Sequence, residues 1–483
     1  MSDKNQNRVI VCGGGLSGLA AAVTALENGA QVMLIEKAPE LGGNAAISNG
    51  VIWSFSDFDR IRAEIPDGDP VLQWLVHDSI DAAWAWLESQ GATLSPKITN
   101  SELGRNERTM APPQAIAALA DKFRRLGGEM RLQAGLDSLI TQDGVIRGVR
   151  ITHDGRTQDG AARAVVIATG GFQGNTELLA RYVVRDPDNL YLRGNPWQTG
   201  DGFLAATQIG AAASPGLDTF YGHALTAPPA RISKQAFRDY TQWYGQQSIA
   251  VNLHGERFAD ESHGSSEHAL NQALAQQPRG MGFYIVDQEL MDAPAVKGKE
   301  QLTRVIFERA RAAKAPIAVA DNIEELCRQL GAFGVPENRL FHEITQFNRL
   351  IESGHAGNLK PPRKRNRKSL SRAPFYAVGV KASITFTMGG LLIDERARVL
   401  RRAGTTSPLA PLPETRPSMA TDAATIAIGA DYRQSAIEGL YAAGCDAGNI
   451  CHFGYMGGLG PALVTGWTAG KSVAGFVKGV AGK

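Results

Sequence analysis

A short apolar strand that runs directly into a glycine-rich turn constrains this chain more than any other stretch of it. The strand covers Arg8–Cys12, and Gly13, Gly15 and Gly18 follow it with the spacing G-x-G-x-x-G. An alanine-rich helical run comes next, and a second apolar strand then ends on an acid, Glu36. Strand, glycine turn, helix, strand and acid in this order predict a βαβ unit that binds a dinucleotide.

The three glycines and the acid have separate expected roles in such a unit. Gly13 permits the tight turn, Gly15 lets a pyrophosphate approach backbone N–H groups, and Gly18 lets the helix lie close to the sheet. Glu36 can accept hydrogen bonds from both ribose hydroxyls, which suits an adenosine without a 2′-phosphate. These residues alone allow either NAD or FAD.

The composition argues against several other classes of protein. The chain has 483 residues, of which 43% are hydrophobic, and a formal net charge of +2, so we expect a globular protein without a general affinity for nucleic acid. Its four cysteines form no CxxC pair and show no zinc spacing, so we expect reduced thiols and no metal site. The sequence shows neither an apolar leader nor 18 consecutive apolar residues, so we expect a cytoplasmic location without a membrane span.

One basic run, Arg363–Lys368, raises the question of a nucleic-acid surface. Two prolines precede this run, and no aromatic residue is interleaved with it. These features favour a solvated loop.

The pattern of apolar residues and turns predicts an α/β fold. Residues 70–91 and 112–127 have the apolar spacing of helices that cover a sheet. The turns Asp143–Gly144 and Asp154–Gly155 separate alternating strands and predict a small antiparallel βββ meander. A buried strand within residues 164–171 then returns to the sheet of the first strand.

The composition changes near residue 214 and divides the chain. From 214 to 372 aromatic, His, Arg and Gln residues become more frequent, whereas glycine-rich turns return after 373. We therefore expect a Rossmann-like dinucleotide-binding domain in two parts, residues 1–213 and 373–483. An inserted α+β capping domain, residues 214–372, interrupts it.

Several further motifs occur in one order along nearly the whole chain. They are Gly42-Gly43-Asn44, Ala168-Thr-Gly-Gly-Phe172, Gly200-Asp-Gly202, Gly255-Glu-Arg-Phe-Ala-Asp-Glu261, Thr387-Met-Gly-Gly390 and Tyr441-Ala-Ala-Gly444. Together with the βαβ unit, they resemble the flavoproteins of the fumarate reductase and succinate dehydrogenase type, with their ketosteroid dehydrogenase and tricarballylate dehydrogenase relatives. A set of motifs in one order is far more specific than any one of them.

The resemblance implies FAD, a capping domain, and hydride transfer between a substrate carbon and flavin N5. Covalent members attach the flavin through a histidine soon after the acid, but residues 42–50 contain none, so we expect non-covalent FAD. An acid usually follows the Ala-Ala-Gly strand to hold the ribityl chain; here Cys445 follows, and whether Asp446 replaces that acid stays open. The residues expected to bind FAD are Gly13, Gly14, Gly15, Leu16, Ser17, Gly18, Glu36, Lys37, Gly42, Gly43, Asn44, Ala46, Ala134, Leu136, Ala168, Thr169, Gly170, Asp201, Gly444, Asp446, Gly458 and Leu459.

At the substrate positions of the family this chain departs from its relatives. His223 looks like one of the two histidines that hold the dicarboxylate in fumarate reductases, but Thr385 replaces the second. Ser265 and Tyr455 stand where those enzymes have arginines, one of which is the proton donor. A dianion needs guanidinium groups to replace its lost hydration, so we do not expect turnover of fumarate or succinate.

The resemblance to ketosteroid dehydrogenases is also incomplete. Their tyrosine base stands at the position of Ser265, where a serine can merely fill the space of the larger residue. Their ketone is polarised by a tyrosine hydroxyl and a glycine N–H. Gly457 matches that glycine, but the tyrosine position is Phe453, with Tyr455 nearby. The residues expected near the substrate are Thr385, Phe386, Thr387 and Phe453.

Desaturation beside a carbonyl needs a base for the α-proton, donors for the developing enolate, and a hydride acceptor. The candidate bases are His223, His263, His268 and Tyr455, of which His223 is preferred because it matches a family substrate position. A buried or surface histidine without a catalytic role is the alternative for each of the three histidines.

Three functions stay open at this point. The first is an FAD-dependent dehydrogenase that forms a double bond next to a ketone or carboxylate of a small or cyclic molecule. The second is an enone or alkene reductase of the fumarate reductase type, with electrons from an external donor. The third is a flavin-binding subunit whose chemistry has decayed and which serves in electron transfer or assembly. The expected partners of an enzyme are a small-molecule carbonyl substrate and an unidentified electron acceptor or donor.

Overall fold

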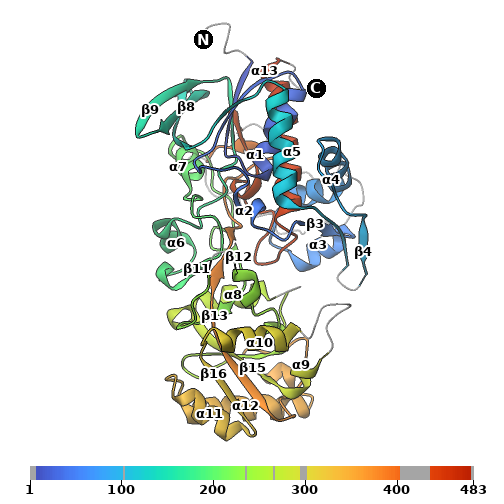
Figure 1. Cartoon of the computed structure of the whole chain (residues 1–483), viewed down its shortest axis with the longest axis vertical. Coiled ribbons are helices and arrows are strands. Elements are labelled where there is room, and N and C mark those ends of the chain that lie inside the picture. Colours follow the sequence, from blue (N-terminus) through green and yellow to red (C-terminus); the bar gives the residue numbers. More distant parts are fainter. Residues whose placement is uncertain are drawn as a thin grey trace, which may run out of the picture. The chain divides into compact units, whose positions relative to one another are not determined.

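The computed structural model describes residues 7–101, 104–233, 236–264, 267–293, 302–402 and 436–479. The chain forms two compact units, and Figure 1 labels many of their elements. Unit 1 comprises residues 1–175, 195–219 and 386–483, and unit 2 comprises residues 176–194 and 220–385.

A six-stranded sheet forms the centre of unit 1. Its strand order is β20, β21, β10, β1, β2 and β6, and all neighbouring strands are parallel except β20 and β21. Residues 9–12 of β1 pair in register with residues 32–35 of β2 on one side and with residues 164–167 of β10 on the other. These buried apolar runs are typical of parallel strands covered on both faces. The predicted Rossmann-like fold and the return of the strand at 164 to the first sheet are confirmed.

The helices and strands of unit 1 follow the chain in three segments. They are β1 (Arg8–Cys12), α1 (Leu16–Glu27), β2 (Gln31–Ile35), α2 (Gly43–Ala46), β3 (Val51–Phe55), α3 (Phe58–Glu64), α4 (Pro70–Ser89), β4 (Ile98–Asn100), β5 (Arg105–Thr109), α5 (Pro112–Arg125), β6 (Glu129–Arg131), β7 (Ala134–Gln142), β8 (Val145–His153), β9 (Arg156–Ala161), β10 (Ala164–Ile167), α7 (Asp201–Gln208), β19 (Phe386–Thr387), β20 (Arg398–Leu400), β21 (Ala436–Ala442) and α13 (Leu459–Val477).

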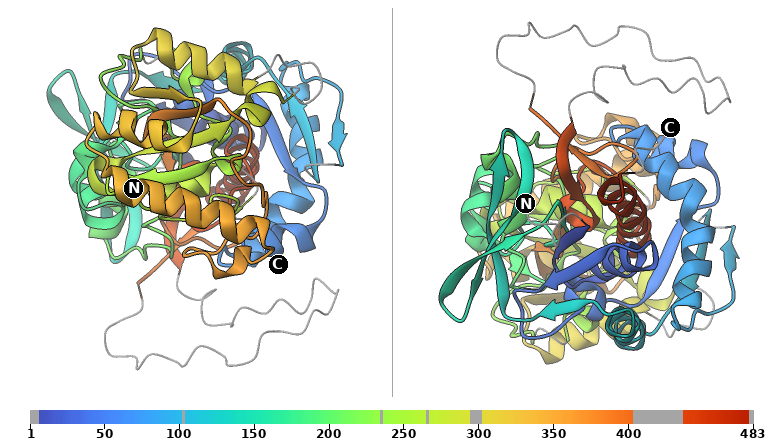
Figure 2. Two further views of the ribbon diagram at one scale, coloured as in Figure 1. Left: turned by 90° about the horizontal axis from the view of Figure 1, so that it is seen from below. Right: turned by 90° about the horizontal axis from the view of Figure 1, so that it is seen from above.

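Small residues bring α1 and α13 into close contact beside the sheet (Figure 2). A Cβ atom on Gly466 of α13 would lie 2.3 Å from the carbonyl oxygen of Ser17, and one on Gly470 would lie 2.6 Å from that of Ala21. The helices predicted at 70–91 and 112–127 are confirmed as α4 and α5, and α5 also contacts α1.

The predicted meander is confirmed as β7, β8 and β9, which pair antiparallel in this order. Both of its turns place two successive residues in the left-handed region. Asp143 and Gly144 have φ of 53° and 74°, and Asp154 and Gly155 have φ of 49° and 69°. An Asp-Gly pair suits such a turn because aspartate tolerates this conformation and glycine adopts it freely.

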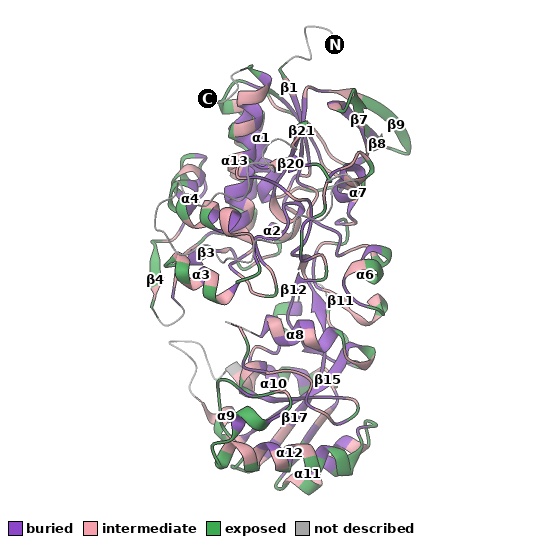
Figure 3. Ribbon diagram, turned by 180° about the vertical axis from the view of Figure 1, so that it is seen from behind, coloured by how far each residue is buried: buried purple, intermediate pink, exposed green. Residues whose placement is uncertain are grey.

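Unit 2 has its own sheet and its own core, as predicted for an α+β domain. The sheet order is β13, β17, β15 and β14, with β16 also paired to β17, and all pairs are antiparallel. Phe283 of β15, Leu326 of α11 and Phe347 of α12 are at most 1% exposed and belong to one core cluster. Figure 3 shows the buried strands β15 and β17 in purple next to these helices.

The helices and strands of unit 2 come from its two segments, residues 176–194 and 220–385. They are α6 (Thr176–Tyr182), β11 (Tyr191–Leu192), β12 (Phe220–Tyr221), β13 (Leu225–Thr226), β14 (Ile249–Asn252), α8 (His268–Ala275), β15 (Met281–Asp287), α9 (Gln288–Asp292), α10 (Leu302–Ala312), β16 (Ile317–Ala320), α11 (Ile323–Gly331), α12 (Glu337–Glu352), β17 (Phe375–Lys381) and β18 (Ser383–Ile384).

The basic run at 363–368 is only partly the solvated loop that its sequence predicts. Residues 364–368 are exposed, but Arg363 is only 1% exposed. Its guanidinium lies 2.8 Å from the carboxylate of Glu261, which Arg257 also approaches to 2.6 Å. The prediction of a solvated residue is therefore wrong for Arg363, because a buried carboxylate distant in the sequence is its partner.

No helix within the described ranges is long and apolar enough to span a membrane.

Candidate functional site

The glycine turn after β1 has the close contacts that its spacing predicts. A Cβ atom on Gly13 would lie 2.0 Å from the carbonyl oxygen of Ala168, and one on Gly18 would lie 1.9 Å from that of Gly13. A Cβ on Gly15 would meet only the carbonyl oxygen of Gly42, at 3.9 Å. Gly13 and Gly18 are thus required by packing, whereas Gly15 leaves open space at the N-terminus of α1, where helix N–H groups lack intrahelical acceptors.

Glu36 at the end of β2 reaches back to the glycine turn. Its Oε2 accepts a hydrogen bond from the Gly14 N–H at 2.6 Å, and its Oε1 accepts one from the Ala38 N–H at 2.7 Å. Burial raises the pKa of this carboxyl, while the backbone donors oppose the rise. The acid is thereby fixed beside the turn, where the ribose of a dinucleotide is expected.

Polar contacts connect other predicted cofactor residues to distant segments of unit 1. Lys37 Nζ lies 2.9 Å from Asp201 Oδ2 and donates to Thr199 Oγ1 at 2.6 Å. The Oδ1 atom of Asn44, on α2, accepts from the Asn195 N–H at 2.7 Å. Ala134 and Leu136 are buried on β7, and Gly42 precedes α2 with φ of 111°.

Asp446, whose role the sequence left open, lies after one strand of unit 1 and is hydrogen-bonded to residues that follow another. It follows β21, and its carboxylate accepts from the Thr169 hydroxyl at 3.0 Å and from the Gly170 N–H at 2.8 Å, just beyond β10. Burial raises its pKa to about 6, against the hydrogen bonds from Gly170 and Thr169. Nearby, Gly444 has φ of 69° and donates its N–H to Thr465 of α13 at 2.9 Å.

Two buried polar side-chain atoms lie close to Gly171. The Thr387 Oγ1 and Gln173 Oε1 atoms are buried and have no hydrogen-bond partner among the described residues. A Cβ on Gly171 would lie 2.5 Å from that Thr387 oxygen and 3.0 Å from that Gln173 oxygen. Unsatisfied buried polar atoms next to a glycine fit a ligand with hydrogen-bonding groups. The residues of unit 1 therefore fit a bound dinucleotide cofactor.

Aromatic rings gather around the predicted substrate residues of unit 1. The Tyr455 ring lies 5.7 Å from that of Trp53 and 6.3 Å from that of Phe386, measured between centroids. Gly457, with φ of 97°, packs against Trp53, and a Cβ on Gly458 would lie 3.1 Å from the Phe386 ring. Trp53 is a neighbour that the sequence did not single out. Phe453, in contrast, is 46% exposed.

The polar centre of unit 2 is a hydrogen-bonded chain through His223. Its Nδ1 lies 2.8 Å from Glu267 Oε2, and its Nε2 lies 3.0 Å from Tyr221 Oη. His223 and Glu267 are 2% and 1% exposed. The Trp243 ring packs on the imidazole, with the centroids 4.3 Å apart.

Glu267 is held by further donors and by a nearby cation. The Tyr284 hydroxyl donates to Glu267 Oε1 at 2.6 Å, and the Ala224 N–H donates at 3.2 Å. Burial raises the pKa of Glu267 to about 8, while Tyr284, Ala224 and the charge of Arg193 oppose the rise. Burial, with Arg193 and His268, holds the pKa of His223 well below its usual range, so the imidazole is neutral.

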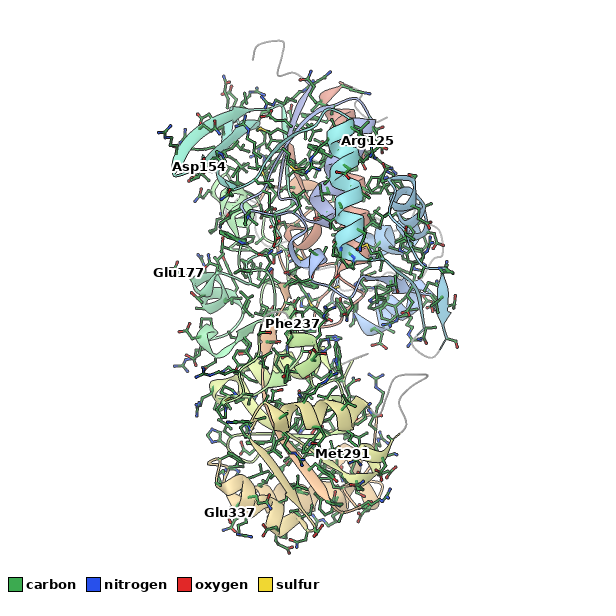
Figure 4. All side chains as sticks on the ribbon, viewed as in Figure 1. Arg125, Asp154, Glu177, Phe237, Met291 and Glu337 are labelled. Atoms are coloured by element: carbon green, nitrogen blue, oxygen red, sulfur yellow. The ribbon has the colours of Figure 1, made fainter. Side chains whose placement is uncertain are left out.

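Arg193 is the second charged group of unit 2 that sequence reasoning missed, after Glu267. It is 6% exposed, and its guanidinium lies 4.8 Å from the ring centroid of Phe237, labelled in Figure 4, and 5.9 Å from that of Tyr221. Glu267 comes from a segment without a recognised site motif. Arg193 begins the stretch that ends in Gly200-Asp-Gly202, a motif of the family resemblance that gave the guanidinium itself no role.

The remaining candidate residues of unit 2 differ in burial and in their contacts. His268 is buried on α8, with its ring 6.4 Å from that of Tyr221, whereas His263 is exposed. The Thr385 N–H donates to the Tyr221 carbonyl at 2.7 Å. Ser265 lies outside the described residues. Among the described side chains, no group of three or more His, Cys, Asp or Glu residues is placed to hold a metal ion.

Comparison with known proteins agrees with the resemblance. A protein-family model described as an FAD binding domain matches residues 8–408. The chain is 26% identical to a probable fumarate reductase of Shewanella frigidimarina, over 97% of this chain and 74% of that protein. It is 22% identical to the 3-oxosteroid 1-dehydrogenase of Mycolicibacterium smegmatis, over 96% of this chain and 97% of that protein.

The fold is also found among solved structures. The 3-ketosteroid delta1-dehydrogenase from Sterolibacterium denitrificans matches with a TM-score of 0.69 at 19% identity, over 97% of this chain and 99% of that chain. The expected relation to fumarate reductases and ketosteroid dehydrogenases is thus confirmed, as is the expected FAD.

Proposed function

The chain belongs to the FAD binding domain family and is an FAD-dependent oxidoreductase acting on CH–CH groups, and from this premise we propose that it is a dehydrogenase. The reaction forms a carbon–carbon double bond next to the carbonyl of a ketone or carboxylate. The substrate is a small or cyclic organic molecule.

Unit 1 supplies the residues that hold the cofactor in this proposal. The glycine turn and α1 bind the pyrophosphate, Glu36 binds the adenosine ribose, and Asp446 stands near the ribityl chain. When bound, FAD supplies the acceptor for the hydride that leaves the β-carbon. The loop at 42–50 contains no histidine, so acid precipitation of the purified protein is expected to release all of the flavin.

The protonation state of His223 supports the oxidising direction of the proposed reaction. When Glu267 is ionised, its carboxylate accepts the Nδ1 proton of the neutral imidazole, which is then a proton acceptor at Nε2. Desaturation begins with removal of an α-proton and needs such an acceptor. Serine, threonine and tyrosine stand at three family positions for dicarboxylate-binding or proton-donating side chains, which disfavours a dianionic substrate.

A second candidate is the reverse reaction on an activated alkene, with electrons from an external donor. It is favoured by the probable fumarate reductase that is 26% identical over 97% of this chain. The same hydrogen-bonded groups would then deliver a proton, as microscopic reversibility requires.

Anaerobic mixing of the oxidised holoenzyme with cyclohexanone, a saturated 3-ketosteroid and propionate tests the proposal. Loss of the flavin absorbance near 450 nm with one of these compounds supports the dehydrogenase. Reoxidation of the photoreduced enzyme by enones or acrylate, without the forward reaction, supports the reductase. Inertness in both directions contradicts both and leaves the electron-transfer or assembly subunit.

A further inference from the structure

We propose that Tyr221 is the catalytic residue with which the substrate exchanges its proton, that His223 takes up the proton behind it, and that Glu267 is a positioning residue. This inference rests on the proposed function, because it assigns the acid–base step of that reaction. All three residues lie in unit 2.

Both ring nitrogens of His223 are engaged by protein groups, Nδ1 by Glu267 and Nε2 by Tyr221. The imidazole is 2% exposed and is packed against Trp243. Tyr221, at the other end of the chain of hydrogen bonds, is only half-buried. A proton therefore reaches His223 along the 3.0 Å hydrogen bond from Tyr221, and the phenol is the member that a substrate can meet.

The charge of Glu267 sets the direction of these hydrogen bonds. Above pH 8, where Glu267 is an anion, its carboxylate accepts from Tyr284 and the Ala224 N–H and also accepts the Nδ1 proton of His223. The Nε2 atom then carries a lone pair, and Tyr221 must donate its hydroxyl proton to it. A phenol that donates its only proton to Nε2 can act toward a substrate only as a proton acceptor.

The backbone around His223 is fixed as well. The Ser383 hydroxyl donates to the His223 carbonyl at 2.5 Å. A Cβ atom on the preceding Gly222 would lie 1.8 Å from the Ser383 carbonyl oxygen, so the two backbone segments are in close contact there. Tight packing keeps the imidazole in one orientation between its two partners, which is the requirement for a proton relay.

In the oxidising direction the proton passes from the substrate through Tyr221 to His223. The α-carbon–hydrogen bond of the substrate breaks, and its proton bonds to Tyr221 Oη while the phenol proton moves to His223 Nε2. The imidazolium so formed is stabilised by the Glu267 carboxylate, and the electron pair of the broken bond stays on the substrate as an enolate. The phenol gains one proton as it gives up the other, so it carries no net charge at the end of the step.

Tyr376 offers a matched control for Tyr221. It is also a half-buried tyrosine of unit 2, and its hydroxyl donates to Gln288, away from the cluster. Tyr221→Phe and Tyr376→Phe therefore remove the same hydroxyl group from similar surroundings, but only the first interrupts the proposed path.

Nitrogen-15 spectra of the histidine-labelled holoenzyme check the hydrogen-bond direction without any substrate. They are recorded above pH 8, where Glu267 is ionised, and His223→Gln identifies the His223 resonances. We expect the proton on Nδ1, and an Nε2 resonance that shifts in Tyr221→Phe and not in Tyr376→Phe. A proton on Nε2, or an Nε2 resonance unmoved in Tyr221→Phe, would overturn the proposal.

Single-turnover kinetics check the role in the reaction, with the compound that reduces the flavin fastest among those tested above. We expect Tyr221→Phe to slow flavin reduction about 100-fold at unchanged flavin content and half-saturating concentration, and Tyr376→Phe to stay within about twofold. If Tyr221→Phe does not slow flavin reduction, the proposed role of Tyr221 is contradicted, while the proposed function is not. If no compound reduces the wild-type flavin, the proposed function fails, while the nitrogen spectra still decide on the hydrogen-bonded path.

Discussion

The Nδ1 atom of His223 lies 2.8 Å from Glu267 Oε2, and both side chains are at most 2% exposed. A neutral amide at position 267 would disturb this pair, because a glutamine NH2 that donates to Nδ1 places the imidazole proton on Nε2. We expect Glu267→Gln to slow substrate-dependent flavin reduction at least about tenfold in stopped-flow absorbance measurements. Glu289→Gln, at a 53% exposed glutamate side chain of unit 2, is the control and should leave the rate unchanged.

The same pair predicts how the rate depends on pH. Burial raises the pKa of Glu267 to about 8, against Tyr284, Ala224 and Arg193. Burial, with Arg193 and His268, holds the pKa of His223 well below its usual range, so His223 is neutral. Below that pH the carboxyl is protonated and donates to Nδ1, so Nε2 carries the ring proton and cannot accept another.

The rate of flavin reduction should therefore rise about tenfold per pH unit toward pH 8 and then level off, and the reverse reaction should slow above pH 8. Single-turnover rates across this range check the profile. A wild-type profile without this rise, or a Glu267→Gln enzyme that keeps it, contradicts the assignment to Glu267.

The glycine turn allows cofactor binding to be separated from folding. A Cβ on Gly15 would have 3.9 Å to its nearest neighbour, whereas one on Gly18 would lie 1.9 Å from the Gly13 carbonyl oxygen. Gly15→Val should give a folded protein with less than about a tenth of the wild-type flavin, since the pyrophosphate loses its approach to the backbone. Gly18→Val should fail to fold. Circular dichroism and the ratio of absorbance at 450 and 280 nm check both, and a flavin-loaded Gly15→Val protein would contradict the nucleotide assignment.

Local patterns explain how much of unit 1 could be predicted. The strand at 8–12, the turn at 13–18 and the Asp-Gly turns at 143 and 154 depend on residues adjacent in the chain, and the structure places all of them as predicted. Hydrophobic periodicity likewise located α4 and α5. These features need no knowledge of what packs against them.

The cluster of unit 2 could not be predicted in the same way. His223 and Glu267 are 44 residues apart, and no motif spacing connects them. A glutamate is usually solvated, so its burial against Tyr284 depends on tertiary packing that the sequence pattern does not encode. The prediction of a solvated Arg363 was wrong for the same reason. The neighbouring residues in the sequence are those of an exposed loop, whereas the partner of Arg363 is the distant Glu261.

That buried ion pair gives the last prediction. Arg363 is 1% exposed, and besides Glu261 it donates to the backbone carbonyls of Ser248 and Gln246. Arg363→Met leaves the two carbonyls without this donor, while Arg257 still compensates the charge of Glu261, so we expect the free energy of unfolding of unit 2 to fall by about 2–4 kcal/mol. Lys364→Met, at the next and exposed position, should change it by less than about 0.5 kcal/mol. Urea unfolding followed by hydrogen exchange of the β14 and β15 amides measures both, and equal stability of the two variants would show that the pair contributes nothing.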